Sequence, residues 1–183
     1  MYFDCVMAGF GGQGILSAGM ILAHMAVSLD LNVTWFPSYG AEQRGGTANC
    51  TVVISDEEIG SPIVQNPKFG LVMNYPSLEK FKSRFEKGAK VVVDSSLVDE
   101  KDLDRKDIDF FCIEATKIAN EMKNPKVANM VMIGGLLRIS NIFPLNTAKE
   151  ALLHAIPKKY HNLLEVNRKA LDLGFEKISK YDL

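Results

Sequence analysis

The stretch YFDCVMAGFGGQGILSAGMILAHMAVSL, residues 2–29, decides the fold. Tyr2–Ala8 is a short apolar run with strand character, and Gly9 ends it. Gly14–Leu29 carries apolar residues on almost every helical face, which predicts a helix that is covered on all sides. A strand, a glycine-rich turn and a helix in this order are typical of an α/β layer fold.

The alternation of strand-like and helix-like segments continues along the chain. Strands are predicted at 32–36 (stopped by Pro37), 47–54, 69–73, 89–93 and 108–113, and helices at 77–85, 115–122, 126–140, 147–155 and 161–173. Ser55–Glu58 predicts a turn, after which Ile59–Val64 returns as the second arm of a hairpin over 47–64. We expect one domain over residues 1–183: an α/β fold with a mostly parallel sheet, flanking helices, an antiparallel hairpin insertion and a helical C-terminal third.

Composition argues against several classes of protein, namely nucleic-acid-binding, membrane-bound, secreted and metal-binding proteins. The net charge of −1 gives no electrostatic reason to expect nucleic-acid or membrane binding. Residues 5–29 carry no charged side chain, but five glycines interrupt them and no basic segment precedes them, so neither a spanning helix nor a signal peptide is expected. The sequence predicts a cytoplasmic protein. Its three cysteines lack Cys-x-x-Cys spacing, which predicts buried reduced thiols and no metal or cluster site.

The first glycine cluster matches G-x-G-x-x-G between a strand and a helix. A dinucleotide site would also need an acidic residue at the end of the second strand, and Val33–Ser38 contains none. A structural turn, or a loop that faces an anion or another subunit, remains open, and the Gln13 amide could serve a ligand or the loop's own backbone. The candidate binding residues of this cluster are Gly9, Gly11, Gly12, Gln13 and Gly14.

The second glycine cluster is rich in groups that can bind a ligand. Arg44 is the only lysine or arginine in the first 67 residues, and its planar guanidinium suits a carboxylate or a phosphate. A surface pair between Glu42 and Arg44 is the simpler alternative. The candidate residues of this cluster are Ser38, Tyr39, Gly40, Glu42, Arg44, Gly45 and Gly46.

The two clusters together carry a family resemblance. GFGGQG at 9–14, followed by YGAEQRGG at 39–46, resembles the gamma subunit of 2-oxoacid:ferredoxin oxidoreductases. SDEEIGSP at 55–62 and NMVMIGG at 129–135 extend the resemblance over essentially the whole chain.

The resemblance implies a subunit of a complex that converts a 2-oxoacid, CoA and oxidised ferredoxin into an acyl-CoA, CO₂ and reduced ferredoxin. It implies alpha and beta thiamine-binding subunits and a ferredoxin-like delta subunit as partners. Thiamine diphosphate, Mg²⁺ and [4Fe-4S] clusters are expected in those partners, and no cofactor or catalytic residue in this chain alone. Both glycine clusters would face the CoA region or a subunit junction, and Arg44 would pair there with a CoA phosphate or a carboxylate of the alpha subunit. An independent nucleotide- or NAD-binding enzyme that uses the first cluster is the alternative.

Several polar residues are expected to have structural roles. His24 is predicted to be a buried, hydrogen-bonded histidine, and His154 and His161 have no acidic partner at metal-ligand spacing. Asn129 is expected to bond the backbone. Asp94 follows a predicted strand and is expected to cap a turn or a helix.

Overall fold

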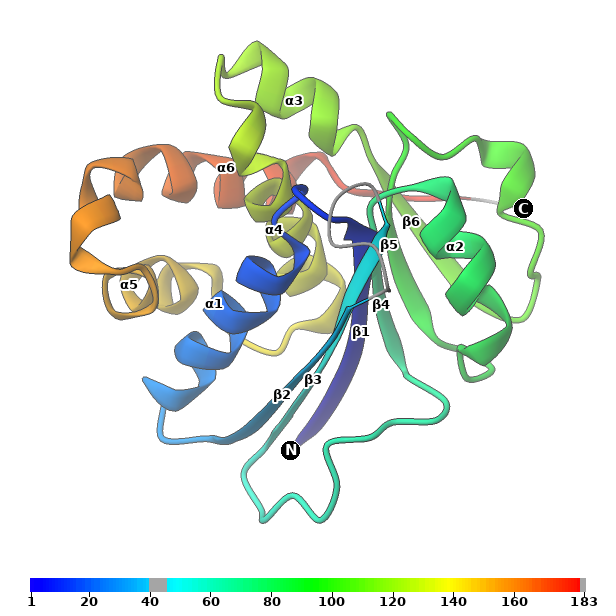
Figure 1. Ribbon diagram of the computed structural model, residues 1–183, viewed down its shortest axis with the longest axis horizontal. Coiled ribbons are helices and arrows are strands. Elements are labelled where there is room, and N and C mark those ends of the chain that lie inside the picture. The colour runs from blue at the N-terminus through cyan, green and yellow to red at the C-terminus, as the bar shows by residue number, and fades with distance from the viewer. Residues whose placement is uncertain (40–45, 182–183) are drawn as a thin grey trace.

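The computed structural model describes residues 1–39 and 46–181, which form one seven-stranded sheet with helices on both faces (Figure 1). The strands are β1 Tyr2–Phe10, β2 Asn32–Tyr39, β3 Thr47–Ser55, β4 Phe69–Val72, β5 Lys90–Asp94, β6 Asp109–Ile113 and β7 Ser179–Lys180. Their order across the sheet is β2-β3-β1-β4-β5-β6-β7. The first strand of the chain therefore lies in the interior of the sheet.

The helices separate into two layers. The α-helices are α1 Ile15–Val27, α2 Tyr75–Phe81, α3 Ala115–Glu121, α4 Ala128–Ser140, α5 Leu145–Ala155 and α6 Leu164–Lys177. Figure 1 shows α1, α4, α5 and α6 on one side of the sheet and α2 on the other. The helical C-terminal third predicted from the sequence is confirmed.

β1 is buried on both faces because its apolar side chains alternate between the two layers. Phe3, Cys5 and Met7 belong to the core under α1 and α4, whereas Val6 and Ala8 belong to the smaller core under α2. A strand that is covered on both sides can be apolar nearly throughout, as this one is.

The sheet is mostly parallel, as predicted, with a long antiparallel part at the β2–β3 side and the short antiparallel strand β7 at the other side. β1, β4, β5 and β6 are joined by parallel pairing, whereas β3 runs antiparallel to both β1 and β2. The antiparallel hairpin is therefore made by β2 and β3. The predicted return arm at Ile59–Val64 is wrong, because these residues form bends and irregular structure with no strand. β2 also continues past Pro37 to Tyr39, since this strand forms the edge of the sheet and tolerates a proline.

Two apolar helices differ in how much of their surface is covered. In α4, every residue except Arg138 and Ser140 is buried, as expected for a helix that is apolar on all faces. The same expectation is wrong for α1, where Met20 is 41% exposed and Val27 is 55% exposed. His24 lies on this open face, so the predicted burial of His24 is also wrong.

Glycines at the contact between α4 and α6 allow the two helix backbones to touch. A Cβ added to Gly134 would overlap the carbonyl oxygen of Leu171, and one added to Gly174 would overlap that of Val131. Backbone atoms cannot move aside as a side chain can. Both positions therefore need glycine for close packing.

Candidate functional site

The candidate site lies where the strands that share one direction end. β1, β4, β5 and β6 are parallel, and β2 has the same direction because it pairs antiparallel with β3. Their carboxyl ends therefore meet at one edge of the sheet, which we call the carboxyl edge (Figure 1). Open α/β sheets bind their ligands at this edge.

The two glycine clusters predicted from the sequence meet at the carboxyl edge. Gly9 and Phe10 end β1, and the Gly11 backbone N–H donates to the Gly46 carbonyl at 3.0 Å. Phe10 also lies opposite Thr47 in the β1–β3 pairing, so strand register brings the clusters together. The part of the second cluster that the structure describes thus shares one surface with the first.

Gly14 starts α1 in a conformation that favours glycine. Its φ of 77° is left-handed, and a Cβ there would lie 2.7 Å from Asn129 Nδ2. Asn129 Nδ2 donates to the Gly14 carbonyl at 3.1 Å, which confirms the predicted backbone-bonding role of Asn129. α1 has neither a side-chain cap nor an acidic residue in its first turn. Its first backbone N–H groups and its positive dipole end therefore remain suited to an anion.

Gln13 bonds the loop that contains it. Its Oε1 accepts hydrogen bonds from the Phe10 backbone N–H at 2.6 Å and from Asn74 Nδ2 at 2.9 Å. Asn74 is the second residue after β4 and is almost completely buried, and its Oδ1 accepts from the Ser77 N–H to cap α2. Sequence reasoning missed Asn74, because it lies 61 residues from Gln13 and its local signal is only that of a helix cap.

The remaining predicted residues of the second cluster are only partly described. Ser38 is exposed near the end of β2, and the Tyr39 backbone pairs with Ala48. Gly40, Glu42, Arg44 and Gly45 lie outside the described residues, so their roles stay predictions from the sequence.

Asp94 has the structural role that the sequence predicted. Its buried carboxylate accepts hydrogen bonds from the Ser96 backbone N–H and from both the N–H and the hydroxyl of Thr116. It therefore joins the turn after β5 to the first turn of α3 at the carboxyl edge.

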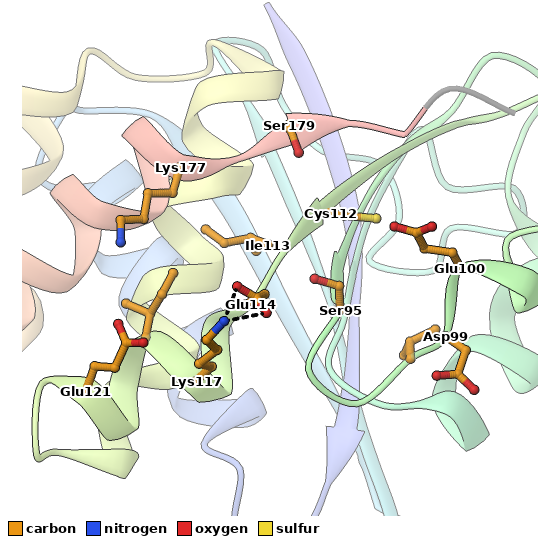
Figure 2. A pocket seen from close by; sticks show the side chains of 12 residues that line it. Ser95, Asp99, Glu100, Cys112, Ile113, Glu114, Lys117, Glu121, Lys177 and Ser179 are labelled. Atoms are coloured by element: carbon orange, nitrogen blue, oxygen red, sulfur yellow. Dashed lines mark hydrogen bonds and ion pairs between the residues drawn. The ribbon is translucent and has the colours of Figure 1, made fainter.

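A separate cavity of about 610 Å³ is lined by the segment that follows β5, the end of β6, α3 and the end of α6 (Figure 2). Its charged lining residues are Asp99, Glu100, Glu114, Glu121, Lys117 and Lys177. Four carboxylates face two ammonium groups, and Lys117 is already paired with Glu114 at 2.9 Å. This excess of negative charge makes the cavity a poor site for a phosphate, in contrast to the glycine loop.

The Cys112 thiol faces the same cavity (Figure 2). Burial, and then the charge of Glu100, raise the pKa of Cys112 to about 11. The thiol stays protonated at neutral pH and is a weak nucleophile.

The other two cysteines lie inside the protein. Cys5 and Cys50 are buried in the core under α1, and burial raises the pKa of Cys50 to about 12. Among residues 1–39 and 46–181, no three His, Cys, Asp or Glu side chains are grouped so as to hold a metal ion. In the same part of the chain, no helix is both long enough and apolar enough to cross a membrane.

The strand order argues against a dinucleotide site. That site places the second strand beside the first, so that an acidic residue at its end reaches the ribose. Here β3 separates β2 from β1, and β2 ends without Asp or Glu. Asp30 precedes β2, at the opposite end of that strand.

Comparison with known proteins identifies the family. The profile of the family described as pyruvate ferredoxin/flavodoxin oxidoreductase matches residues 4–177. The 2-oxoglutarate synthase subunit KorC of Methanocaldococcus jannaschii is 38% identical over 93% of this chain and 90% of its own length. The gamma subunit of keto/oxoacid ferredoxin oxidoreductase from Geobacter sulfurreducens superposes with a TM-score of 0.80, at 28% identity over 96% of this chain and 97% of that one.

A further solved structure is larger than this chain. The 2-oxoglutarate:ferredoxin oxidoreductase of Magnetococcus marinus, solved with 2-oxoglutarate, coenzyme A and succinyl-CoA bound, has a TM-score of 0.83 at 31% identity. The match covers 95% of this chain but 30% of that chain, so the whole fold described above corresponds to one part of a longer polypeptide. The protein belongs to the pyruvate ferredoxin/flavodoxin oxidoreductase family.

Proposed function

We propose that this chain is the gamma subunit of a cytoplasmic 2-oxoacid:ferredoxin oxidoreductase. The assembled enzyme would convert a 2-oxoacid, CoA and oxidised ferredoxin into an acyl-CoA, CO₂ and reduced ferredoxin. The proposal is supported by the agreement in sequence and in fold with 2-oxoacid oxidoreductase subunits along nearly the full chain.

Within that enzyme, the carboxyl edge would form part of the CoA region at a subunit junction. The observation that carries this assignment is the meeting of the two glycine clusters through Gly11 and Gly46, directly beside the uncapped start of α1. CoA carries phosphates, and an uncapped helix start with a glycine loop favours an anion. The acidic cavity near Cys112 offers no comparable site.

The redox and thiamine chemistry would take place in the partner subunits. We expect alpha and beta subunits to bind thiamine diphosphate with Mg²⁺, and a ferredoxin-like delta subunit to hold [4Fe-4S] clusters. The cysteines of this chain do not fit a cluster, because Cys5 and Cys50 are buried in one core while Cys112 lies on β6 beside an acidic cavity.

The test is reconstitution. Tagged wild-type chain should co-purify with the alpha and beta thiamine-binding subunits, and the mixture should form acyl-CoA. Arg44→Ala should weaken assembly or raise the KM for CoA by about tenfold, since a charged hydrogen bond contributes about 1.5–3 kcal/mol. Lys80→Ala, at an exposed position of α2, serves as the control. Wild-type assembly and KM in the Arg44 variant would exclude Arg44 from the junction, and failure of the wild-type chain to assemble would refute the proposed function.

A further inference from the structure

The hydrogen bonds around Gln13 leave its amide only one orientation. The Phe10 backbone N–H can only donate, so the Gln13 atom that it contacts must be the oxygen, Oε1. At the other end, the Ser77 N–H requires Asn74 to present Oδ1. Asn74 must then present Nδ2 to Gln13, which agrees with the observed contact of 2.9 Å.

The orientation of the amide decides which atom of Gln13 is available to a ligand. Oε1 already accepts two hydrogen bonds, whereas Nε2 makes none with any other described residue. The Gln13 side chain is half-buried in the loop before α1, at the carboxyl edge. It therefore carries a hydrogen-bond donor whose direction the fold has set.

We infer that Gln13 Nε2 donates a hydrogen bond to an acceptor oxygen of CoA, and that Asn74 is a positioning residue that holds the Gln13 amide in the required orientation. The inference rests on the proposed function, because it takes the carboxyl edge to be the CoA region. A phosphate or an amide carbonyl of CoA would supply the acceptor, and the backbone N–H groups at the start of α1 would favour the anion beside it.

Asn74 suits this role because its two functions can be separated by mutation. Asn74→Ser keeps an oxygen that can cap α2, since serine is a good N-cap residue. The shorter side chain cannot reach Gln13 Oε1, so one of the two contacts that orient the amide is lost and no charge is introduced. Gln13→Glu keeps an acceptor for Phe10 and Asn74 but replaces the Nε2 donor with a carboxylate oxygen.

The experiment measures steady-state kinetics of the reconstituted complex with each variant. Gln13→Glu should raise the KM for CoA by about tenfold or more, and Asn74→Ser by about two- to tenfold. For both variants, we expect the kcat at saturating CoA and the KM for the 2-oxoacid to stay within about twofold of wild type. Loss of a purely structural contact would change assembly or kcat and would not act on CoA alone.

Two matched controls make the same chemical changes outside the loop that Gln13 and Asn74 join. The controls are Gln65→Glu and Asn120→Ser. Gln65 lies in the exposed connection before β4, and Asn120 lies on the exposed side of α3. Both should leave the KM for CoA unchanged. If the wild-type chain assembles and is active while Gln13→Glu and Asn74→Ser keep the wild-type KM for CoA, the inference is overturned and the proposed function stands. If the wild-type chain does not assemble, the proposed function itself fails.

Discussion

At the scale of single residues, the buried position of Asp4 disfavours the charged form of its carboxylate. Asp4 lies in β1 and is 2% exposed, and its Oδ1 accepts the Lys68 backbone N–H at 2.7 Å. Burial raises the pKa of Asp4 above its ordinary value of 3.8, the Lys68 hydrogen bond and charge lower it, and Glu86 raises it further. The net shift is upward, so the folded protein binds this proton more tightly than the unfolded chain does.

That shift gives a pH dependence with a definite sign. The free energy of unfolding should fall as the pH rises from about 3.8 through the raised folded-state pKa, because the native state must then hold a buried charge. Asp4→Asn removes this contribution and keeps an acceptor for Lys68. Urea unfolding at pH 4, 5.5 and 7 should show the variant gaining stability relative to wild type as the pH increases. A pH-independent difference in stability between Asp4→Asn and wild type would contradict the expectation.

At the scale of the elements, the contact between α4 and α6 depends on the absence of two side chains. Gly134 faces the Leu171 carbonyl and Gly174 faces the Val131 carbonyl, so each helix packs directly on the other's backbone. α4 is the most completely buried helix described here and supports the sheet behind the carboxyl edge. A change in its position would reach Asn129 and the Gly14 carbonyl that Asn129 bonds.

Adding one methyl group at this contact should be costly. We expect Gly134→Ala and Gly174→Ala each to lower the free energy of unfolding by about 1–3 kcal/mol through overpacking, although alanine favours the helix itself. Chemical denaturation monitored by circular dichroism measures the effect. Gly60→Ala is the control, because nothing lies within 4 Å of its added Cβ, and it should change stability by no more than about 0.5 kcal/mol. A Gly134→Ala protein as stable as wild type would show that the helices can separate at no cost.

The sequence predicted the positions of the strands and helices better than it predicted strand pairing and burial. The β-branched run Val91–Val93 predicted a strand close to β5, and the apolar stretch around Asn129 predicted a helix close to α4. Ile59–Val64 had strand-like residues, but Gly60 and Pro62 interrupt them and no neighbouring strand pairs with them. The open face of α1 could not be predicted, because Met20 and Val27 are as apolar as the residues that are buried.

The same limit applies to the candidate site. The glycine motifs located the carboxyl edge, because strand, turn and helix follow one another directly in the chain. The bond from Asn74 to Gln13 joins residues 61 positions apart, and only strand order brings them together. Periodicity and local motifs contain no information about a contact of this kind.

At the scale of the whole molecule, we propose that the partner subunits carry the chemistry and that this chain contributes a surface of the CoA region. Its Cys112 thiol has a raised pKa, and residues 1–39 and 46–181 contain no group of metal ligands. We therefore expect the isolated chain, supplied with thiamine diphosphate, Mg²⁺, a 2-oxoacid, CoA and an electron acceptor, to form no acyl-CoA. Chromatographic assay of acyl-CoA should detect product only after the partner subunits are added. Turnover by the isolated chain would contradict the assignment of the chemistry to those partners.

The interior position of β1 also has a consequence for how the chain folds. β1 leaves the ribosome before both of its partners, which are β3, about 40 residues later at Met7 and Cys50, and β4, about 60 residues later at Met7 and Leu71. At about 5–20 residues per second, synthesis needs roughly 3–12 s to supply the second partner. During that interval the nascent chain carries an apolar strand with unpaired edges, which is the form most prone to aggregation. We therefore expect long-range pairing of β1 to slow the folding of this subunit, and the segment around β1 to be where a chaperone has the most time to act.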